Sequence, residues 1–267
     1  MVRVRIVVDE DNKPDSGWAS ASDDVTQQVS ALERAIATSI SSHSLASSAE
    51  AAASRSSLTN DAVHIEVVTP SSWERDRAPA VEDEILCPLT LNIPETLDFA
   101  GRSLYSKCRD VPALRRYVHD QWGDAGGSGE FWQPIVWTAK GPLYAEVIGQ
   151  PAALSSPKTP SRFSQPFHLA DRLRQPLYHL GYRLLNSLNA IPGTYLIQFG
   201  IHHQRLCFDR LYPFPALPAI ASIGVQTPNL FECHWRCLIN QPILDLAIPS
   251  TQAFWKLDLT QSEVLTS

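Results

Sequence analysis

The chain has 267 residues and a net charge of −6, with 44% hydrophobic and 19% charged residues. This composition is typical of a globular protein with a large buried core, and the length fits one or two domains. The acidic balance argues against a nucleic-acid binder that works through a broad basic surface. It is compatible with a local basic pocket that holds a small anion such as a nucleotide.

No apolar run approaches the roughly 20 residues that a membrane-spanning helix needs, so no membrane association is expected. The N-terminal stretch MVRVRIVVDED becomes acidic too early for a signal peptide, which predicts a cytoplasmic protein. The cysteines are odd in number and scattered, which favours reduced thiols over a disulfide framework. They are Cys87, Cys108, Cys207, Cys233 and Cys237.

The N-terminal part, residues 1–84, reads as a small βαβ region with a Ser/Ala-rich loop. Its predicted elements are a strand over Val2–Val8, a helix over Val25–Ile40 and a strand over Val63–Thr69. Apolar residues alternate in the strands and recur every three or four positions in the helix. Asp23 or Asp24 is the expected N-cap of the helix. The tract 39–57 has little to bury and is expected to be a loop or a weak helix.

The remaining pattern predicts alternating helices and antiparallel strands, so the fold class is α/β of the α+β type. The expected helices cover Val111–Trp122, Leu169–Leu188 and Asn229–Ile239. The expected strands cover Ile85–Leu91, Glu130–Val136, Pro142–Ile148, Tyr195–Ile201 and Arg205–Leu211. The expected loops cover Trp73–Glu84 and Pro151–Gln165. Pro112 suits the first turn of its helix.

The C-terminal third carries a pattern that extends over several elements. A long helix ends in a Pro-Gly turn and is followed by GTYLIQFGI, a short hairpin, CFDRLYPFPA and PNLFECHWRCLINQPILDL. This order resembles the C-terminal part of ATP-grasp enzymes, most closely N5-carboxyaminoimidazole ribonucleotide synthase. The resemblance covers about residues 169–259 and, weakly, 85–150. It implies an ATP-grasp-like domain over residues 85–267.

The departures from the family pattern fall on its chemistry. The resemblance places one metal-binding glutamate of the family at Gln198 and the other at Arg210, with Asp209 at the adjacent asparagine position. Magnesium prefers hard, charged oxygen ligands, whereas an amide is a weak ligand and a guanidinium repels the ion. Lys107 is the only lysine in the segment where the family's ATP-contacting lysine falls. These four residues are the candidate cofactor-binding residues, and no catalytic residue or metal ligand is assigned.

The proline-rich loop Pro213–Pro215 is the second departure. The arginine and histidine that face the substrate in the family are replaced here by Phe214 and Ala216. Aromatic side chains on a rigid loop suit protein recognition, because little entropy is lost on binding. The loop is therefore a candidate partner site, with Tyr212 and Phe214 as its aromatic residues and Phe214 as an exposed anchor.

Two other motifs have a functional and a structural interpretation. A zinc site is one interpretation of the cluster His202, His203, Cys207, Cys233, His234 and Cys237. Its spacing is not that of a zinc knuckle, so buried helix cysteines and hairpin-turn histidines are the simpler interpretation. The glycine-rich GDAGGSG lacks the lysine of a P-loop and precedes a strand, which favours a plain turn over a phosphate loop. Asp209 and Arg210 are either a strand-end ion pair or part of a pocket.

Three functions remain open from the sequence. The first is an ATP-grasp relative without ligase chemistry that binds ATP or ADP or a partner, with Arg210 holding an anion where the metal charge would be. The second is an active carboxylate–amine ligase whose metal ligands are relocated to Asp209 with Glu146 or Glu232. The third is a structural subunit of a larger complex. The resemblance also implies a homodimer, since related enzymes are often dimers, whereas the lost carboxylates argue against magnesium.

Overall fold

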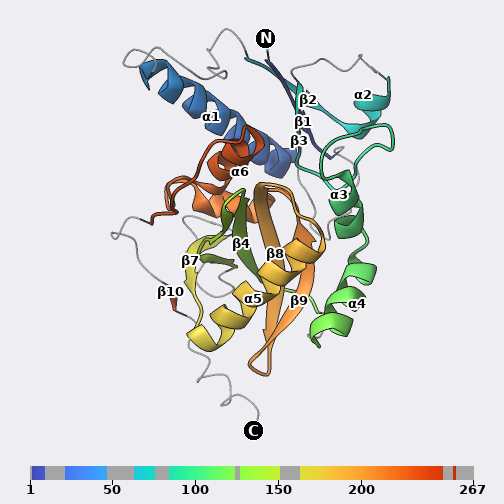
Figure 1. Cartoon of the computed structure of the whole chain (residues 1–267), viewed down its shortest axis with the longest axis vertical. Helices are drawn as coiled ribbons and strands as arrows, with labels where there is room; N and C mark the ends of the chain where they lie inside the picture. Colours follow the sequence, from blue (N-terminus) through green and yellow to red (C-terminus); the bar gives the residue numbers. More distant parts are fainter. Residues whose placement is uncertain are drawn as a thin grey trace.

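The computed structural model describes residues 2–9, 22–46, 63–75, 84–123, 127–150, 163–248 and 255–256 (Figure 1). A three-stranded parallel sheet forms its N-terminal part. Strand β1 (Val2–Val7) lies in the middle, between β2 (Val63–Val68) and β3 (Glu84–Pro88). Helix α1 (Ser22–Ala46) connects β1 to β2, so the predicted βαβ unit is confirmed.

Several N-terminal details differ from the prediction. Helix α1 begins at Ser22, so Asp23 and Asp24 lie in its first turn and neither is the N-cap. The helix extends to Ala46, which takes in the first part of the Ser/Ala tract; residues 47–62 lie outside the described residues. A short helix, α2 (Pro70–Arg75), occupies the start of the expected loop. Strand β3 pairs with β1, and so belongs to the N-terminal sheet although most of it follows residue 84.

The second sheet is mostly antiparallel and has the order β10-β7-β6-β4-β8-β9, with β5 added to β4. Its strands are β4 (Phe131–Thr138), β5 (Gly141–Tyr144), β6 (Val147–Gly149), β7 (Ser164–His168), β8 (Gly193–His202), β9 (Arg205–Tyr212) and β10 (Trp255–Lys256). Both predicted antiparallel pairs are present, as β4–β5 and β8–β9. Strand β7 falls partly within the expected loop 151–165, of which residues 151–162 lie outside the described residues.

The other helices are α3 (Arg102–Arg109), α4 (Val111–Trp122), α5 (Asp171–Ser187), the 3₁₀ helix η2 (Leu217–Ser222) and α6 (Leu230–Leu238). Helix α4 has the predicted bounds because a capping residue marks each of its ends. The Asp110 carboxylate accepts a hydrogen bond from the backbone of Ala113, and Gly123 adopts the left-handed conformation at the other end. No helix among the described residues is long and apolar enough to cross a membrane.

Helices cover both faces of the second sheet. Tyr195 and Ile197 of β8 pack in one core cluster with the apolar residues of α3, α4 and α5. Leu196, between them, faces the opposite side and joins a cluster that includes Leu32 of α1 and Trp235 of α6. Figure 1 shows α5 lying across β8 and β9, and α1 beside α6. One continuous core therefore includes residues from both sides of residue 84.

His234 connects α6 to the start of β8. The Nδ1 atom accepts a hydrogen bond of 3.1 Å from the backbone N–H of Thr194, which requires the unprotonated form of that nitrogen. The side chain is buried, and Nε2 has no hydrogen-bond partner within the described ranges. Burial lowers the pKa of His234 to about 4 from its ordinary value of 6.5, because a charged imidazolium would be desolvated there.

The lowered pKa predicts an acid sensitivity of the fold. The unfolded chain binds a proton at this histidine below about pH 6.5, whereas the folded chain resists it until about pH 4. The free energy of unfolding should therefore fall by up to about 3 kcal/mol over that interval, beyond the loss due to other groups. Urea unfolding of the wild type and of His234→Asn at pH 7 and pH 4.5 measures it. The variant should lose less stability on acidification, and equal losses would contradict the assignment.

Candidate functional site

Strands β8 and β9 bring three of the four candidate residues together. Gln198 lies directly opposite Arg210 in the antiparallel register, and the register shifts immediately after Gln198. Asp209 precedes Arg210 on β9, and the residue is 3% exposed. The structure therefore places Gln198, Asp209 and Arg210 at one position on the sheet.

Asp209 is neutralised within the protein. Its Oδ1 atom forms an ion pair with the guanidinium of Arg115 on α4, and its Oδ2 atom accepts a hydrogen bond of 2.9 Å from the backbone N–H of Gly129. Arg115 Nε also donates to the backbone oxygen of Asp209 at 2.9 Å. Both carboxylate oxygens are therefore engaged by α4 and by the segment before β4, which we call the glycine segment (residues 127–129).

Gln198 holds the same glycine segment from the neighbouring strand. Its Nε2 atom donates a hydrogen bond of 2.7 Å to the carbonyl oxygen of Gly129, and its Oε1 atom lies 3.3 Å from the hydroxyl of Tyr212. The backbone N–H of Gly127 donates to the carbonyl of Phe208 at 3.2 Å. The glycine segment thus lies against β8 and β9 at the positions where the resemblance puts metal-binding carboxylates.

The close approach of this segment depends on glycine. A Cβ on Gly129 would lie 2.4 Å from backbone atoms of Phe199, and a Cβ on Gly200 would lie 2.8 Å from the carbonyl oxygen of Ser128. Any side chain at either position would push the glycine segment off the sheet. The sequence interpretation of GDAGGSG as a plain turn therefore misses a packing role, and residues 124–126 of it lie outside the described residues.

Arg210 and Lys107 have different surroundings. Arg210 Nε lies 3.5 Å from Asp209 Oδ1, and the Arg210 side chain is 17% exposed. Lys107 is exposed near the end of α3 and lines a separate depression with Tyr117 and Leu188. The structure therefore does not bring Lys107 into the contacts around Asp209.

The two glutamates that the alternative hypothesis offers as relocated metal ligands contact other groups of the protein. Glu146 lies beside His168, with 3.4 Å between Oε2 and Nδ1. Glu232 accepts from the backbone N–H of Asn229 in the capping box of α6. Within the described ranges, no group of three or more His, Cys, Asp or Glu side chains is arranged to hold a metal ion. This finding covers the zinc interpretation as well.

The helix cysteines belong to the core. Cys233 and Cys237 are buried free thiols, and Cys233 Sγ lies 3.5 Å from the carbonyl oxygen of Pro228. Burial raises the pKa of Cys237 to about 12, so this sulfur stays protonated at neutral pH. His202 and His203 lie in and beside the β8–β9 turn and are exposed.

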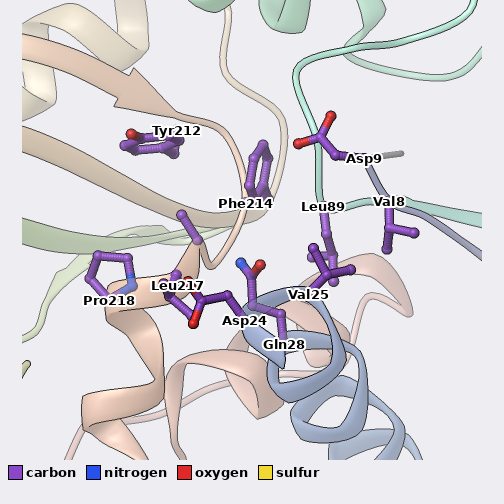
Figure 2. A pocket seen from close by; sticks show the side chains of 11 residues that line it. Val8, Asp9, Asp24, Val25, Gln28, Leu89, Tyr212, Phe214, Leu217 and Pro218 are labelled. Carbon is purple, nitrogen blue, oxygen red and sulfur yellow. The ribbon is translucent and has the colours of Figure 1, made fainter. Parts of the chain in front are cut away.

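A second candidate place is the cavity between the N-terminal sheet and the end of β9 (Figure 2). Its volume is about 60 Å³, which is room for a few water molecules and not for a nucleotide. Asp9, which follows β1, and Asp24 of α1 contribute carboxylates to its lining. A larger depression of about 560 Å³ shares Asp24 and Leu217 with it.

The aromatic side chains of Tyr212 and Phe214 line this cavity, which we call the inner cleft. Phe214 is 4% exposed and Tyr212 is 5% exposed, so the expectation that Phe214 is an exposed partner anchor is wrong. Phe214 stacks on Tyr105 of α3 with 6.0 Å between ring centroids, and Figure 2 shows it between Tyr212 and Leu89. The aromatic residues of the rigid loop are thus part of the core rather than of a surface.

The comparisons with known proteins agree with this architecture. No protein-family model matches the chain. It matches glycinamide-RNase-transformylase T from Mycobacterium tuberculosis with a TM-score of 0.54 and 14% identity over 90% of this chain and 80% of that one. It matches an ADP complex of N5-carboxyaminoimidazole ribonucleotide synthetase with a TM-score of 0.57 and 9% identity over 92% of this chain and 79% of that one. The fold is that of ATP-grasp enzymes.

A curated relative supports the same resemblance at the level of sequence. The chain is 27% identical over 84 residues to a formate-dependent phosphoribosylglycinamide formyltransferase from Prochlorococcus marinus subsp. pastoris. The match covers 32% of this chain and 21% of the length of that relative. The resemblance to ATP-grasp ligases of this kind therefore has both structural and sequence support.

The glycine segment gives a direct test of the site. Gly129→Ala should lower the free energy of unfolding by about 2 to 3 kcal/mol, because its Cβ would overlap the backbone of Phe199. Gly127→Ala is the matched control, since a Cβ there has its nearest neighbours at 3.8 and 3.9 Å. Chemical denaturation of both variants measures the difference. Equal stability of the two variants would show that the segment does not bind the sheet as described.

Proposed function

We propose that this chain is an ATP-grasp-like protein that binds a nucleotide without magnesium and does not catalyse ATP-dependent ligation. The observation that carries the proposal is that both carboxylate oxygens of Asp209 are bound within the protein. Asp209 is the one acidic residue at the aligned positions, and Arg115 and Gly129 already engage both of its oxygens. Electrostatic stabilisation is commonly the largest catalytic contribution, so the loss of metal-binding carboxylates removes the main basis of ligase chemistry.

The surroundings of Gln198 support the same proposal. Its amide nitrogen, a donor that cannot ligate a cation, is directed at the Gly129 carbonyl. A magnesium ion at this position would have to displace the glycine segment and compete with two arginines, Arg115 and Arg210. Arg210, partly exposed beside this network, supplies the positive charge that would attract a phosphate in place of the metal.

An active ligase remains the second hypothesis from the sequence, and a structural subunit the third. The ligase needs Asp209 to combine with Glu146 or Glu232, which instead contact His168 and the N-terminus of α6. The partner-binding form of the first hypothesis loses its proposed anchor, because Phe214 and Tyr212 are buried. Nucleotide binding is therefore the form of the hypothesis that we retain.

Calorimetric titration with ATP and with ADP tests the proposal, each with magnesium and with a chelator. We expect the same affinity in both conditions and no release of phosphate from ATP. Arg210→Glu should weaken binding at least about tenfold, because it replaces a charge-assisted contact by repulsion. Arg116→Glu is the matched control, because it makes the same change of charge at an exposed arginine. This variant should bind the nucleotide like the wild type.

Two results would contradict the proposal. Binding or turnover that requires magnesium would favour the ligase hypothesis, and the absence of binding to the wild type would favour a structural subunit. Arg210→Lys guards against a trivial loss through misfolding, because it keeps the charge. It should retain most of the affinity that Arg210→Glu loses.

A further inference from the structure

The tip of the β8–β9 hairpin, the start of α5 and the end of α4 lie at the same end of the molecule (Figure 1). Between them is a cavity of about 690 Å³, which we call the tip cavity. This volume suits a small organic ligand. Gln198, Asp209 and Arg210 are not among its lining residues.

The lining of the tip cavity is basic. Arg172 comes from the first turn of α5, His202 and Arg205 from the ends of β8 and β9, and His203 from the turn between them. None of the described residues that line the cavity is acidic, in a chain whose net charge is −6. Such a concentration of one sign of charge in a concave place attracts anions.

The hairpin turn fixes the position of two of these residues. His203 and Gln204 have φ values of 48° and 61°, so the two-residue turn has the left-handed backbone that a tight hairpin requires. Non-glycine residues adopt this conformation at a cost in free energy, so its presence at two successive residues indicates a turn of defined geometry. As a result His202 and Arg205 lie directly opposite each other in the register.

The wall of the tip cavity also offers donors and apolar surface. The indole Nε1 of Trp122, which lines the cavity, is buried and has no hydrogen-bond acceptor among the residues that the structure describes. Leu173 and Leu206, both buried, add apolar surface from the face of the sheet that α5 covers. A ligand that fits these walls has several acceptor oxygens and a negative charge, together with an organic part.

We propose that the tip cavity binds a small organic molecule with a diphosphate or another multiply charged phosphate group, and that it does so without a metal ion. Arg172 and Arg205 neutralise the phosphate charge from two sides, and the apolar wall receives the organic part. Planar guanidinium groups suit paired phosphate oxygens because they donate two parallel hydrogen bonds. None of Gln198, Asp209 and Arg210 lines the tip cavity, so the two proposals can be tested with different variants.

Calorimetric titration of the full chain with inorganic pyrophosphate in the presence of a chelator tests this site. Arg172→Ser and Arg205→Ser should each weaken binding at least about tenfold, since each removes a charged contact to phosphate. Arg116→Ser is the matched control, because Arg116 is an exposed arginine that does not line the cavity. Arg205→Lys keeps the charge and should retain an affinity between those of the wild type and Arg205→Ser.

The outcomes separate this site from the one at Arg210. Arg210→Glu should weaken nucleotide binding at least about tenfold if the proposed function holds, and the loss of pyrophosphate affinity caused by Arg172→Ser or Arg205→Ser should be the same with and without that substitution. The inference is overturned if the wild type does not bind pyrophosphate, if binding requires magnesium, or if all arginine variants bind alike. Loss of pyrophosphate binding in Arg210→Glu but not in Arg172→Ser or Arg205→Ser would place the anion at Arg210 instead.

Discussion

The buried carboxylate of Asp209 constrains the structure around it. A charge at 3% exposure is stable only when it is paired and hydrogen-bonded, and Arg115 and Gly129 supply these contacts. Helix α4 and the glycine segment are thereby fixed to β9. The need for glycine at positions 129 and 200 follows, because the segment can reach Asp209 and Gln198 only by touching the backbone of β8.

This constraint explains how an ATP-grasp fold is stable with Gln198 and Arg210 at these two positions. The resemblance in sequence places metal-binding carboxylates of the family at Gln198 and Arg210 of these two strands. Here a carboxylate of the same strands stabilises the protein itself, and the opposite residue is an amide that donates to the backbone. The fold depends on the nearly continuous burial of β8 and β9, whose apolar residues pack into the cores on both faces of the sheet.

The periodic spacing of apolar residues made many helices and strands predictable from the sequence. Contacts between residues far apart in the chain could not be predicted in this way. Helix α4 has its predicted bounds because Asp110 and Gly123 mark its ends within the local sequence. The partnership of Asp209 with Arg115 has no local signal, since 94 residues separate them. The burial of Phe214 was missed for the same reason. A proline-rich loop is typically exposed, whereas this one is covered by distant parts of the chain, including Tyr105 of α3 and Gln28 of α1.

The inner cleft and the tip cavity differ in the ligands that their chemistry accepts. Tyr105 of α3 packs near the inner cleft, with its hydroxyl 3.1 Å from the carbonyl oxygens of both Pro88 and Pro213. The lining of the cleft carries the carboxylates of Asp9 and Asp24. Ser164 Oγ and Gln165 Oε1, in the adjoining depression, are buried oxygens without a hydrogen-bond partner in the described part of the chain. The carboxylates repel phosphate and the amide oxygen of Gln165 cannot donate to it, whereas the arginines of the tip cavity attract it. An anionic ligand is therefore better accommodated at the hairpin end than in the cleft between the two sheets.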